Sequence, residues 1–286
     1  MRFLSFKQDG KEGLAVAGND GSFVGLTATD AGYPGNLDAL VRQGSAALAK
    51  AGEALAKGKP VAIDQVDVLP PLSQPPKIFC LGLNYKDHAK EAGLELPDYP
   101  TIFTRFASSL LGHDANIVRP RISHQLDYEG ELAVVLGKGG RHIAVADALE
   151  YVAGYSVFND GSIRDYQIRT SQWTVGKTFD ATGAFGPTLV TPDEVPVGAS
   201  GLKIETRLNG QVVQRSNTDQ LIFDVATVIS LMSQAITLEA GDLFIMGTPS
   251  GVGHFHKPPL YMKPGDICEV EIEGLGLLRN GIEDEQ

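Results

Sequence analysis

Short apolar segments separated by glycine turns make up most of the chain after Lys77. Six of these segments are predicted to form strands, at residues 77–83, 131–136, 152–158, 203–208, 243–246 and 267–272. In this part of the chain, helical periodicity is clearest at 224–235, and a second short helix fits 86–92. Long helices do not alternate regularly with the strands, which disfavours a doubly wound parallel sheet. The pattern therefore predicts a mixed β fold with few helices, in the α+β class.

Residues 1–70 differ in sequence pattern from the rest of the chain and are predicted to form a small α/β module. The turn signal Asn19-Asp20-Gly21 separates two β-like pieces and predicts a hairpin. Apolar residues at spacings near 3.6 predict a helix over 37–57. Valine and isoleucine between 61 and 68 predict a further strand.

A proline-rich connector follows this module. Pro70-Pro71 and Pro75-Pro76 stiffen the chain, because proline fixes its own φ and favours extended neighbours. We therefore expect two domains, a small N-terminal one over 1–70 and a catalytic one over 71–286.

The charge balance limits the classes of partner. The sequence has 24 lysine and arginine residues against 35 aspartate and glutamate residues, a net charge of −11. This balance argues against nucleic acid and against an anionic membrane surface as partners. No apolar run approaches the roughly 18 residues of a membrane span, and the first nine residues contain no apolar stretch of signal-peptide length. We therefore expect a cytoplasmic protein that acts on a small molecule.

Two carboxylates lead directly into an apolar strand. In a strand, Glu129 and Glu131 point to the same face with Cα atoms about 7 Å apart, so they repel unless a cation lies between them or one is protonated. Asp160 follows another apolar strand and could supply a third oxygen ligand. Carboxylates without a nearby Cys or His cluster favour Mg²⁺ or Mn²⁺ over Zn²⁺. The alternatives are exposed charges at a strand end and, for Asp160, a helix or turn cap.

A histidine and a glutamate form the second candidate group. On the helix predicted at 86–92, His88 and Glu91 are three residues apart and share a face. Such a pair can activate water, because the acid orients the imidazole and stabilises its protonated form. A surface salt bridge is the alternative. His254 and His256 have no evident third ligand partner and are interpreted as loop residues.

Four more polar residues are suited to binding an anion. Arg164 and Gln167 follow the third acid and could hold a carboxylate. Lys177 follows a glycine between apolar residues, where an ammonium group could stabilise an oxyanion. Thr248 lies in a glycine-rich turn that lacks the Gly-Lys-Ser/Thr ending of a phosphate loop, so a small anion fits better than a nucleotide.

Taken in order, these segments resemble the fumarylacetoacetate hydrolase family over about residues 75 to 280. The matching motifs are Gly82-Leu83-Asn84-Tyr85 with His88 and Glu91, Asp127-Tyr128-Glu129-Gly130-Glu131, Phe158-Asn159-Asp160 with Arg164-Asp165 and Gln167, Gly176-Lys177 with Phe179-Asp180, and Gly247-Thr248-Pro249-Ser250-Gly251-Val252-Gly253. Each motif is weak alone, but the ordered set is specific. The resemblance implies a β-roll-like catalytic domain, usually in a homodimer.

The resemblance also implies roles for these residues. Glu129, Glu131 and Asp160 would hold one Mg²⁺ or Mn²⁺, and His88 with Glu91 would form the water-activating pair on a mobile lid. The positions expected to contact substrate are Tyr85, Arg164, Gln167, Lys177 and Thr248. Of these, Lys177 would also stabilise an oxyanion. Gly161 occupies a position where many members have valine. We expect this difference to change the packing of the pocket, so the resemblance does not identify the substrate.

The expected reaction is metal-dependent hydrolysis of a C–C bond in an acylpyruvate-type 2-oxo acid through a pyruvate enolate. A role in the catabolism of aromatic compounds accompanies this expectation. Decarboxylation of an oxaloacetate-like acid and isomerisation of an unsaturated 2-oxo dicarboxylic acid use the same metal and enolate. From other classes, a non-catalytic metabolite-binding protein and a structural dimer module are the alternatives.

Overall fold

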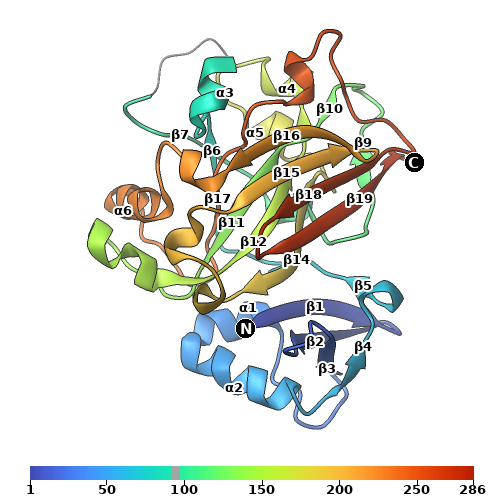
Figure 1. Ribbon diagram of the computed structural model, residues 1–286, viewed down its shortest axis with the longest axis vertical. Coiled ribbons are helices and arrows are strands. Elements are labelled where there is room, and N and C mark those ends of the chain that lie inside the picture. The colour runs from blue at the N-terminus through green and yellow to red at the C-terminus, as the bar shows by residue number, and fades with distance from the viewer. Residues whose placement is uncertain (92–96) are drawn as a thin grey trace.

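The computed structural model describes residues 1–91 and 97–286, and within them the largest sheet has twelve strands (Figure 1). Its main path runs in the order β4 (Lys59–Val61), β3 (Phe23–Thr27), β2 (Lys11–Ala17), β1 (Arg2–Gln8), β14 (Gly183–Val190), β12 (Val152–Asp160), β11 (Gly130–Leu136), β17 (Leu243–Ile245), β6 (Ile78–Gly82) and β7 (Thr101–Thr104). Beside this path, β5 (Asp67–Val68) pairs with β1 and β8 (Leu110–Leu111) pairs with β14.

Two smaller sheets and six α-helices complete the described fold. The five-stranded sheet has the order β16 (Gln211–Asn217), β15 (Lys203–Leu208), β18 (Ile267–Ile272), β19 (Gly276–Asp284) and β9 (Ile117–Arg119), and the two-stranded one pairs β10 (Leu126–Asp127) with β13 (Ser162–Ile163). The helices are α1 (Leu37–Gln43), α2 (Ser45–Leu55), α3 (Lys86–Glu91), α4 (Arg164–Gln167), α5 (Thr174–Lys177) and α6 (Val225–Ala235). The predicted α+β class is confirmed. No helix within the described residues has the length and apolar character to cross a membrane.

The central strand β11 is buried along its whole length. Leu132 and Val134 belong to the core cluster that includes Ile204 of β15 and Val270 of β18. The alternate residue Val135 belongs to a second cluster, shared with residues of α1 and α2. The large sheet is therefore covered on one face by the five-stranded sheet and on the other by the N-terminal helices, as a continuous apolar strand sequence requires.

Several predicted elements are confirmed. Strands β15 and β18 have the predicted bounds, and the hairpin of β2 and β3 forms at the predicted turn. Helix α6 begins where Asp224 accepts a hydrogen bond from the backbone N–H of Thr227, a typical N-cap. Helix α3 covers the predicted helix as far as Glu91, and Ala92 lies outside the described residues.

Two predictions in the first 70 residues differ from the structure. The single helix expected over 37–57 is two helices, because Gly44 has a φ of 90°, in a backbone region reserved for glycine. Both helices bury leucines in one core, so the apolar spacing continues across the break. The single strand expected over 61–68 is divided into β4 and β5 by a 3₁₀ turn at Ile63–Gln65, and these strands pair with different partners.

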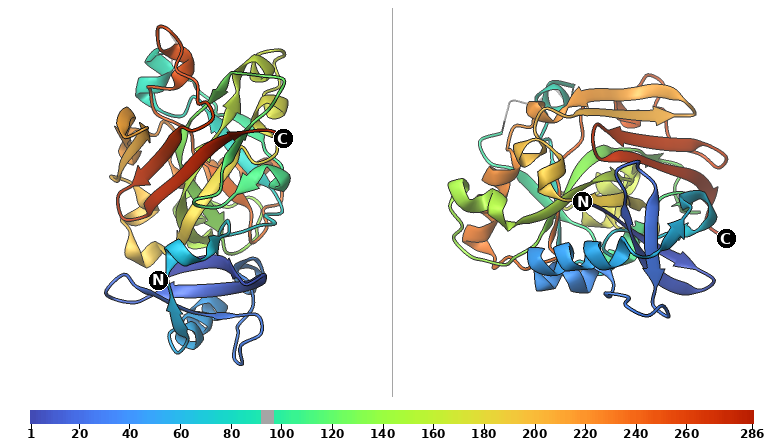
Figure 2. Two further views of the ribbon diagram at one scale, coloured as in Figure 1. Left: turned by 90° about the vertical axis from the view of Figure 1, so that its right-hand side faces the viewer. Right: turned by 60° about the horizontal axis from the view of Figure 1, so that its bottom comes forward.

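The N-terminal residues and the rest of the chain share one sheet. Arg2 and Phe3 of β1 pair with Val190 and Leu189 of β14, so the sheet continues through the expected boundary. Helices α3 and α4 lie at the end of the molecule away from β1–β4 (Figures 1 and 2). The division into domains 1–70 and 71–286 stays a prediction.

Candidate active site

Three carboxylates converge at one end of β11 and β12. Glu129 immediately precedes β11, Glu131 lies within it, and Asp160 is the last residue of β12. The two strands pair antiparallel, and the backbone N–H of Asp160 donates to the carbonyl of Glu129 over 2.8 Å. One carboxylate oxygen from each residue lies within 4.8 Å of the others, and all three side chains are buried. Strand pairing therefore brings together the acids that the sequence places in separate segments.

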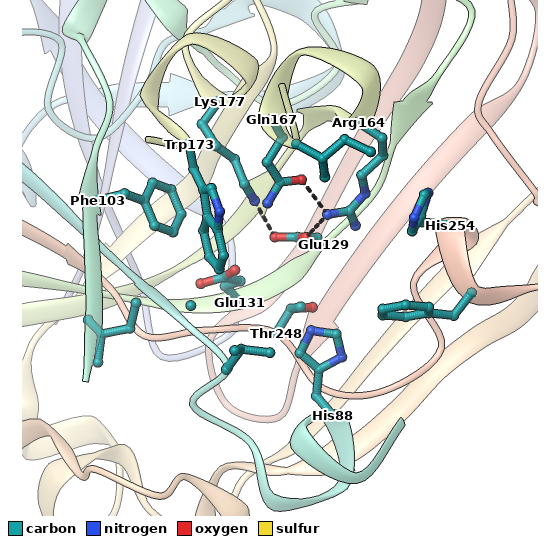
Figure 3. Close-up of a pocket in the computed structure, with 15 residues that line it drawn as sticks. His88, Phe103, Glu129, Glu131, Arg164, Gln167, Trp173, Lys177, Thr248 and His254 are labelled. Carbon is teal, nitrogen blue, oxygen red and sulfur yellow. Dashed lines mark hydrogen bonds and ion pairs between the residues drawn. The ribbon is translucent and has the colours of Figure 1, made fainter. Parts of the chain in front are cut away.

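Two cations neutralise Glu129 (Figure 3). Lys177 Nζ, at the end of α5, lies 2.5 Å from Glu129 Oε2 and 2.6 Å from Asp160 Oδ2. Arg164 Nη1, in α4, lies 2.7 Å from Glu129 Oε1. Burial by itself would raise the pKa of Glu129, but Lys177 and Arg164 favour its ionised form and hold this pKa at about 2. The same carboxylates raise the pKa of Lys177 against the effect of burial, so its ammonium group stays charged.

Glu131 lacks such a partner. Its Oε2 accepts the backbone N–H of Gly247 over 2.5 Å, and no basic side chain in the described parts of the chain lies within ion-pair distance. Burial and the charges of Asp160 and Glu129 raise the pKa of Glu131 well above its usual range. A hard divalent cation among the three acids would supply the missing positive charge, with one carboxylate oxygen from each acid as a ligand. The residues therefore fit Mg²⁺ or Mn²⁺.

Arg164 is held so that part of its guanidinium group remains free. Nε lies 2.8 Å from Asp127 Oδ2, and Nη1 donates to Gln167 Oε1 over 2.8 Å. Asp127 is fixed in turn by backbone N–H groups of Gly253 and His254, at 2.8 and 2.9 Å. Arg164 Nη2 is buried and has no hydrogen-bond partner among the described residues. A buried donor without a partner is costly, so this group is suited to binding an anionic ligand.

His88 and Glu91 form the predicted pair. His88 Nδ1 lies 3.0 Å from Glu91 Oε2, and Glu91 Oε1 accepts the backbone N–H of Gly251 over 2.9 Å. An ionised carboxylate only accepts hydrogen bonds, which places the ring proton of neutral His88 on Nδ1 and leaves Nε2 unprotonated. In Figure 3, His88 lies across the drawn site from Lys177 and Gln167, beside Thr248.

These groups surround a cavity of about 220 Å³. Its polar side contains Glu129, Glu131, Lys177 and Arg164. His88, Gln167, Thr248 and His254 are further polar lining residues, and the apolar part of the lining is contributed by Leu81, Leu83, Phe103, Ile168, Trp173 and Phe255. A cavity of this size that combines a free arginine donor, two of the three acids and a histidine suits a small carboxylic acid.

The comparisons with known proteins agree with this geometry. Residues 77–283 match the family model described as fumarylacetoacetate (FAA) hydrolase C-terminal. The chain belongs to the fumarylacetoacetate hydrolase family. The human oxaloacetate tautomerase FAHD2A, mitochondrial, is 44% identical over 288 residues, which cover 99% of this chain and 91% of the relative.

Two solved structures of family members have the same fold. The fumarylacetoacetate hydrolase from psychrophilic Exiguobacterium antarcticum superposes with a TM-score of 0.86 at 36% identity, and the match covers 100% of both chains. The maleylpyruvate hydrolase from Sphingobium sp. SYK-6, in complex with manganese(II) ion and pyruvate, superposes with a TM-score of 0.82 at 25% identity, again over 100% of both chains. The protein is therefore an enzyme of this superfamily, whose members act on small oxo acids as hydrolases, isomerases or tautomerases.

One expectation is wrong. The cytoplasmic location conflicts with the human and rat relatives, whose names place them in mitochondria. This expectation relied on the acidic charge balance and on the lack of long apolar runs, and neither feature distinguishes one aqueous compartment from another. A role in aromatic catabolism has no support in the comparisons, and the homodimer stays a prediction.

The predicted substrate contacts of this family member divide into two groups. Arg164, Gln167, Lys177 and Thr248 all line the cavity. Tyr85 is fully buried in the core, and it is not one of the described residues that line the cavity. The backbone of Tyr85 forms a bridge with Leu221, and the ring packs inward, where burial raises the pKa of its hydroxyl. The structure thus gives no support for contact between Tyr85 and substrate.

Gly161 is not one of the described residues that line the cavity, and its expected effect on pocket packing stays a prediction. A Cβ atom at this position would lie 2.2 Å from the carbonyl oxygen of Thr182. The glycine therefore permits close packing beside Asp160, the last residue of β12.

Sequence reasoning missed Arg105 and His254. Arg105 Nη1 lies 2.5 Å from Asp160 Oδ1, across 55 positions of sequence, and no local pattern indicates this contact. His254, interpreted as a loop residue, lines the cavity, with Nδ1 2.9 Å from the hydroxyl of Tyr261. Burial and the nearby Arg164 lower the pKa of His254.

Proposed function

We propose that this enzyme interconverts the keto and enol forms of a small 2-oxo dicarboxylic acid of the oxaloacetate type, with Mg²⁺ or Mn²⁺ bound. The observation that carries the proposal is a single cavity lined by His88, whose Nδ1 contacts Glu91, and by Glu129 and Glu131 of an acidic triad that lacks one counter-charge. The similarity to the oxaloacetate tautomerases over 99% of the chain supports this substrate class.

Glu129, Glu131 and Asp160 would hold the cation. When bound, Mg²⁺ or Mn²⁺ acts as a Lewis acid that makes a neighbouring 2-oxo group more electron-withdrawing and its C3 protons more acidic. The free Nη2 of Arg164 would bind the substrate carboxylate, and Gln167 holds the guanidinium group in place.

His88 and Lys177 would carry out the proton transfer and stabilise the charge. His88 Nε2 takes a proton from C3 of the keto form, and Glu91 stabilises the resulting imidazolium. The C–H electron pair becomes the C2–C3 double bond, and negative charge develops on the 2-oxygen near the Lys177 ammonium group. Proton return to that oxygen gives the enol, so the reaction consumes no water and needs no oxidant.

Hydrolysis of an acylpyruvate is the second candidate, and the His88–Glu91 pair is the observation that favours it. Here His88 would take a proton from water as the water attacks the distal carbonyl. The C–C bond then breaks to give a carboxylic acid and the enol of pyruvate. The structural similarity to a maleylpyruvate hydrolase supports this reaction.

The two candidates are distinguished by parallel assays of the purified protein with Mg²⁺ or Mn²⁺. Decay of the ultraviolet absorbance of enol-oxaloacetate measures tautomerisation, and pyruvate release from acetylpyruvate or fumarylpyruvate measures hydrolysis. Pyruvate release from oxaloacetate measures decarboxylation. Metal without protein and the His88→Ala variant are the controls for spontaneous reaction. Tautomerisation at the rate of these controls would refute the first proposal.

A further inference from the structure

Arg105 is a buried cation that the proposed chemistry does not use. It directly follows β7, and its side chain and that of Asp160 are both fully buried. Nη1 lies 2.5 Å from Asp160 Oδ1 and 3.0 Å from the carbonyl oxygen of Gly161. Arg105 is not one of the described residues that line the cavity, so it is not placed to touch substrate.

The guanidinium group is held on its other sides as well. Nη2 donates to Thr182 Oγ1 over 2.8 Å, and Nε donates to Ser109 Oγ over 3.2 Å. The ring centroid of Phe158 lies 5.7 Å from Cζ. Because the plane of the group is fixed by partners other than Asp160, its position does not depend on the carboxylate that it binds.

Glycines make room for this arrangement. A Cβ atom at Gly183 would lie 2.8 Å from Nη2 of Arg105. A Cβ atom at Gly161 would push away Thr182, whose hydroxyl holds the same guanidinium group. Two glycines in separate segments thus permit one planar cation to be packed behind Asp160.

We propose that Arg105 is a positioning residue for the metal ligand Asp160, an inference that depends on the metal centre proposed above. By holding Oδ1, Arg105 fixes the plane of the carboxylate, whose Oδ2 lies 2.6 Å from Lys177 Nζ, the group that also contacts Glu129. A carboxylate group otherwise rotates over a broad range about its last torsion. Fixing it in advance removes that freedom before the cation binds, as outer partners of metal ligands generally do.

The direction in which Mn²⁺ affinity changes when Arg105 is replaced distinguishes a positioning role from simple charge balance. If Arg105 only neutralised Asp160, its removal would take a positive charge away from the cation site and tighten Mn²⁺ binding by Coulomb attraction. If Arg105 positions the ligand, its removal weakens binding, by about 10- to 100-fold for an outer partner of this kind.

The test is the Mn²⁺ affinity of the metal-stripped 286-residue protein, measured from the electron paramagnetic resonance signal of free Mn²⁺. We expect Arg105→Gln to raise the Kd for Mn²⁺ by about 10- to 100-fold. At saturating Mn²⁺, the KM for the substrate should stay unchanged, since Arg105 does not line the cavity. Arg119→Gln is the control for loss of an arginine ion pair outside the acidic triad, because Arg119 Nε lies 2.7 Å from Asp284 on β19 in a more exposed place.

Thr182→Val is the second variant, for the case that Arg105→Gln does not fold. It removes the hydroxyl that holds Nη2 and leaves the charge of Arg105 in place, so a weaker Mn²⁺ affinity is again expected. Unchanged or tighter binding in the folded variants would overturn the role of Arg105. Failure of the wild-type protein to bind Mn²⁺ would instead overturn the proposed metal centre.

Discussion

The tautomer of His88 depends on the acid beside it. Glu91 accepts from Gly251 N–H through Oε1 and from His88 through Oε2. In Glu91→Gln, the Gly251 N–H holds the amide oxygen, so the amide nitrogen faces His88 and donates to Nδ1. The ring proton then moves to Nε2, and the base is lost. We expect kcat to fall by about 10²- to 10⁴-fold, with Mn²⁺ affinity unchanged.

Steady-state kinetics at saturating Mn²⁺ checks this prediction. Glu53→Gln, at an exposed position of α2, is the control and should retain the wild-type rate. A Glu91→Gln variant with full activity would show that the His88–Glu91 pair has no part in the rate-limiting proton transfer.

The uncompensated charge of Glu131 leads to a second prediction. In Glu131→Gln, the amide oxygen would still accept the Gly247 N–H, but the neutral side chain would not repel Asp160 and Glu129. In EDTA we expect Glu131→Gln to stabilise the protein by about 1 kcal/mol or more, a rise of about 2–4 °C in Tm. Added Mn²⁺ at 100 times its Kd should stabilise the wild type by about 2.7 kcal/mol and the variant hardly at all.

Thermal unfolding with and without Mn²⁺ measures both effects. Glu269→Gln is the matched control, because Glu269 already has a cationic partner in Arg207, 3.0 Å away, and should gain no stability. A lower Tm for Glu131→Gln than for the wild type in EDTA would contradict the prediction that the Glu131 carboxylate destabilises the protein when no cation is bound.

Spacing within one element fixes the geometry of two predicted pairs, whereas Asp160 and Lys177 lie in other elements and were joined to them through the ordered motifs. Glu129 and Glu131 share a strand face, and His88 and Glu91 share a helix face, so local periodicity was sufficient. Arg105 reaches Asp160 only through the pairing of distant strands. The motif of Tyr85 matches but its side chain packs into the core, so its contact with substrate stays a prediction.

At the element scale, His113 ties the segment after β8 to β19. The backbone N–H of Arg279 donates to His113 Nδ1 over 3.1 Å, which requires that nitrogen to be unprotonated. Burial, opposed by Asp114 and assisted by Arg279, lowers the pKa of His113. As the pH falls, His113 is therefore protonated in the unfolded chain before it is protonated in the folded protein. The free energy of unfolding should decrease as the pH drops below about 6.5, the ordinary pKa of histidine.

His113→Asn keeps an oxygen acceptor for the Arg279 N–H but does not titrate. We expect its free energy of unfolding to depend less steeply on pH between about 7 and 5 than that of the wild type. Urea unfolding at several pH values measures this slope. His142→Asn, at an exposed histidine, should leave the slope unchanged. Equal slopes for His113→Asn and the wild type would contradict the prediction.

Element boundaries were predictable where one local signal dominates. Asp224 caps α6 within a few residues of sequence, so the start of this helix is visible. Gly44 interrupts a continuous apolar periodicity, and its φ of 90° reflects the packing of two helices on one core rather than a strong local turn signal. The strand expected over 61–68 divides because β4 and β5 have different partners, which no local pattern specifies.

For the whole molecule, the question is whether residues 71–286 fold without residues 1–70. The proline-rich connector predicts that they do, but the core indicates otherwise. Phe3 and Leu37 pack in the same cluster as Val135 and Phe158, which belong to the strands that carry the acidic triad. Residues 1–70 thus cover one face of the sheet that positions the site.

Deletion of residues 1–70 should therefore abolish cooperative folding. The deletion removes β1–β5 with both helices α1 and α2, exposes the face of β11 that contains Val135, and leaves β14 without its partner β1. In the full chain, Phe3→Ala should already cost about 3–5 kcal/mol, since the side chain is fully buried. Urea unfolding, near-ultraviolet circular dichroism and Mn²⁺ binding measure these losses. A fragment 71–286 that unfolds cooperatively and binds Mn²⁺ like the full chain would instead establish residue 70 as a true folding boundary, because its core would then be complete without the N-terminal helices.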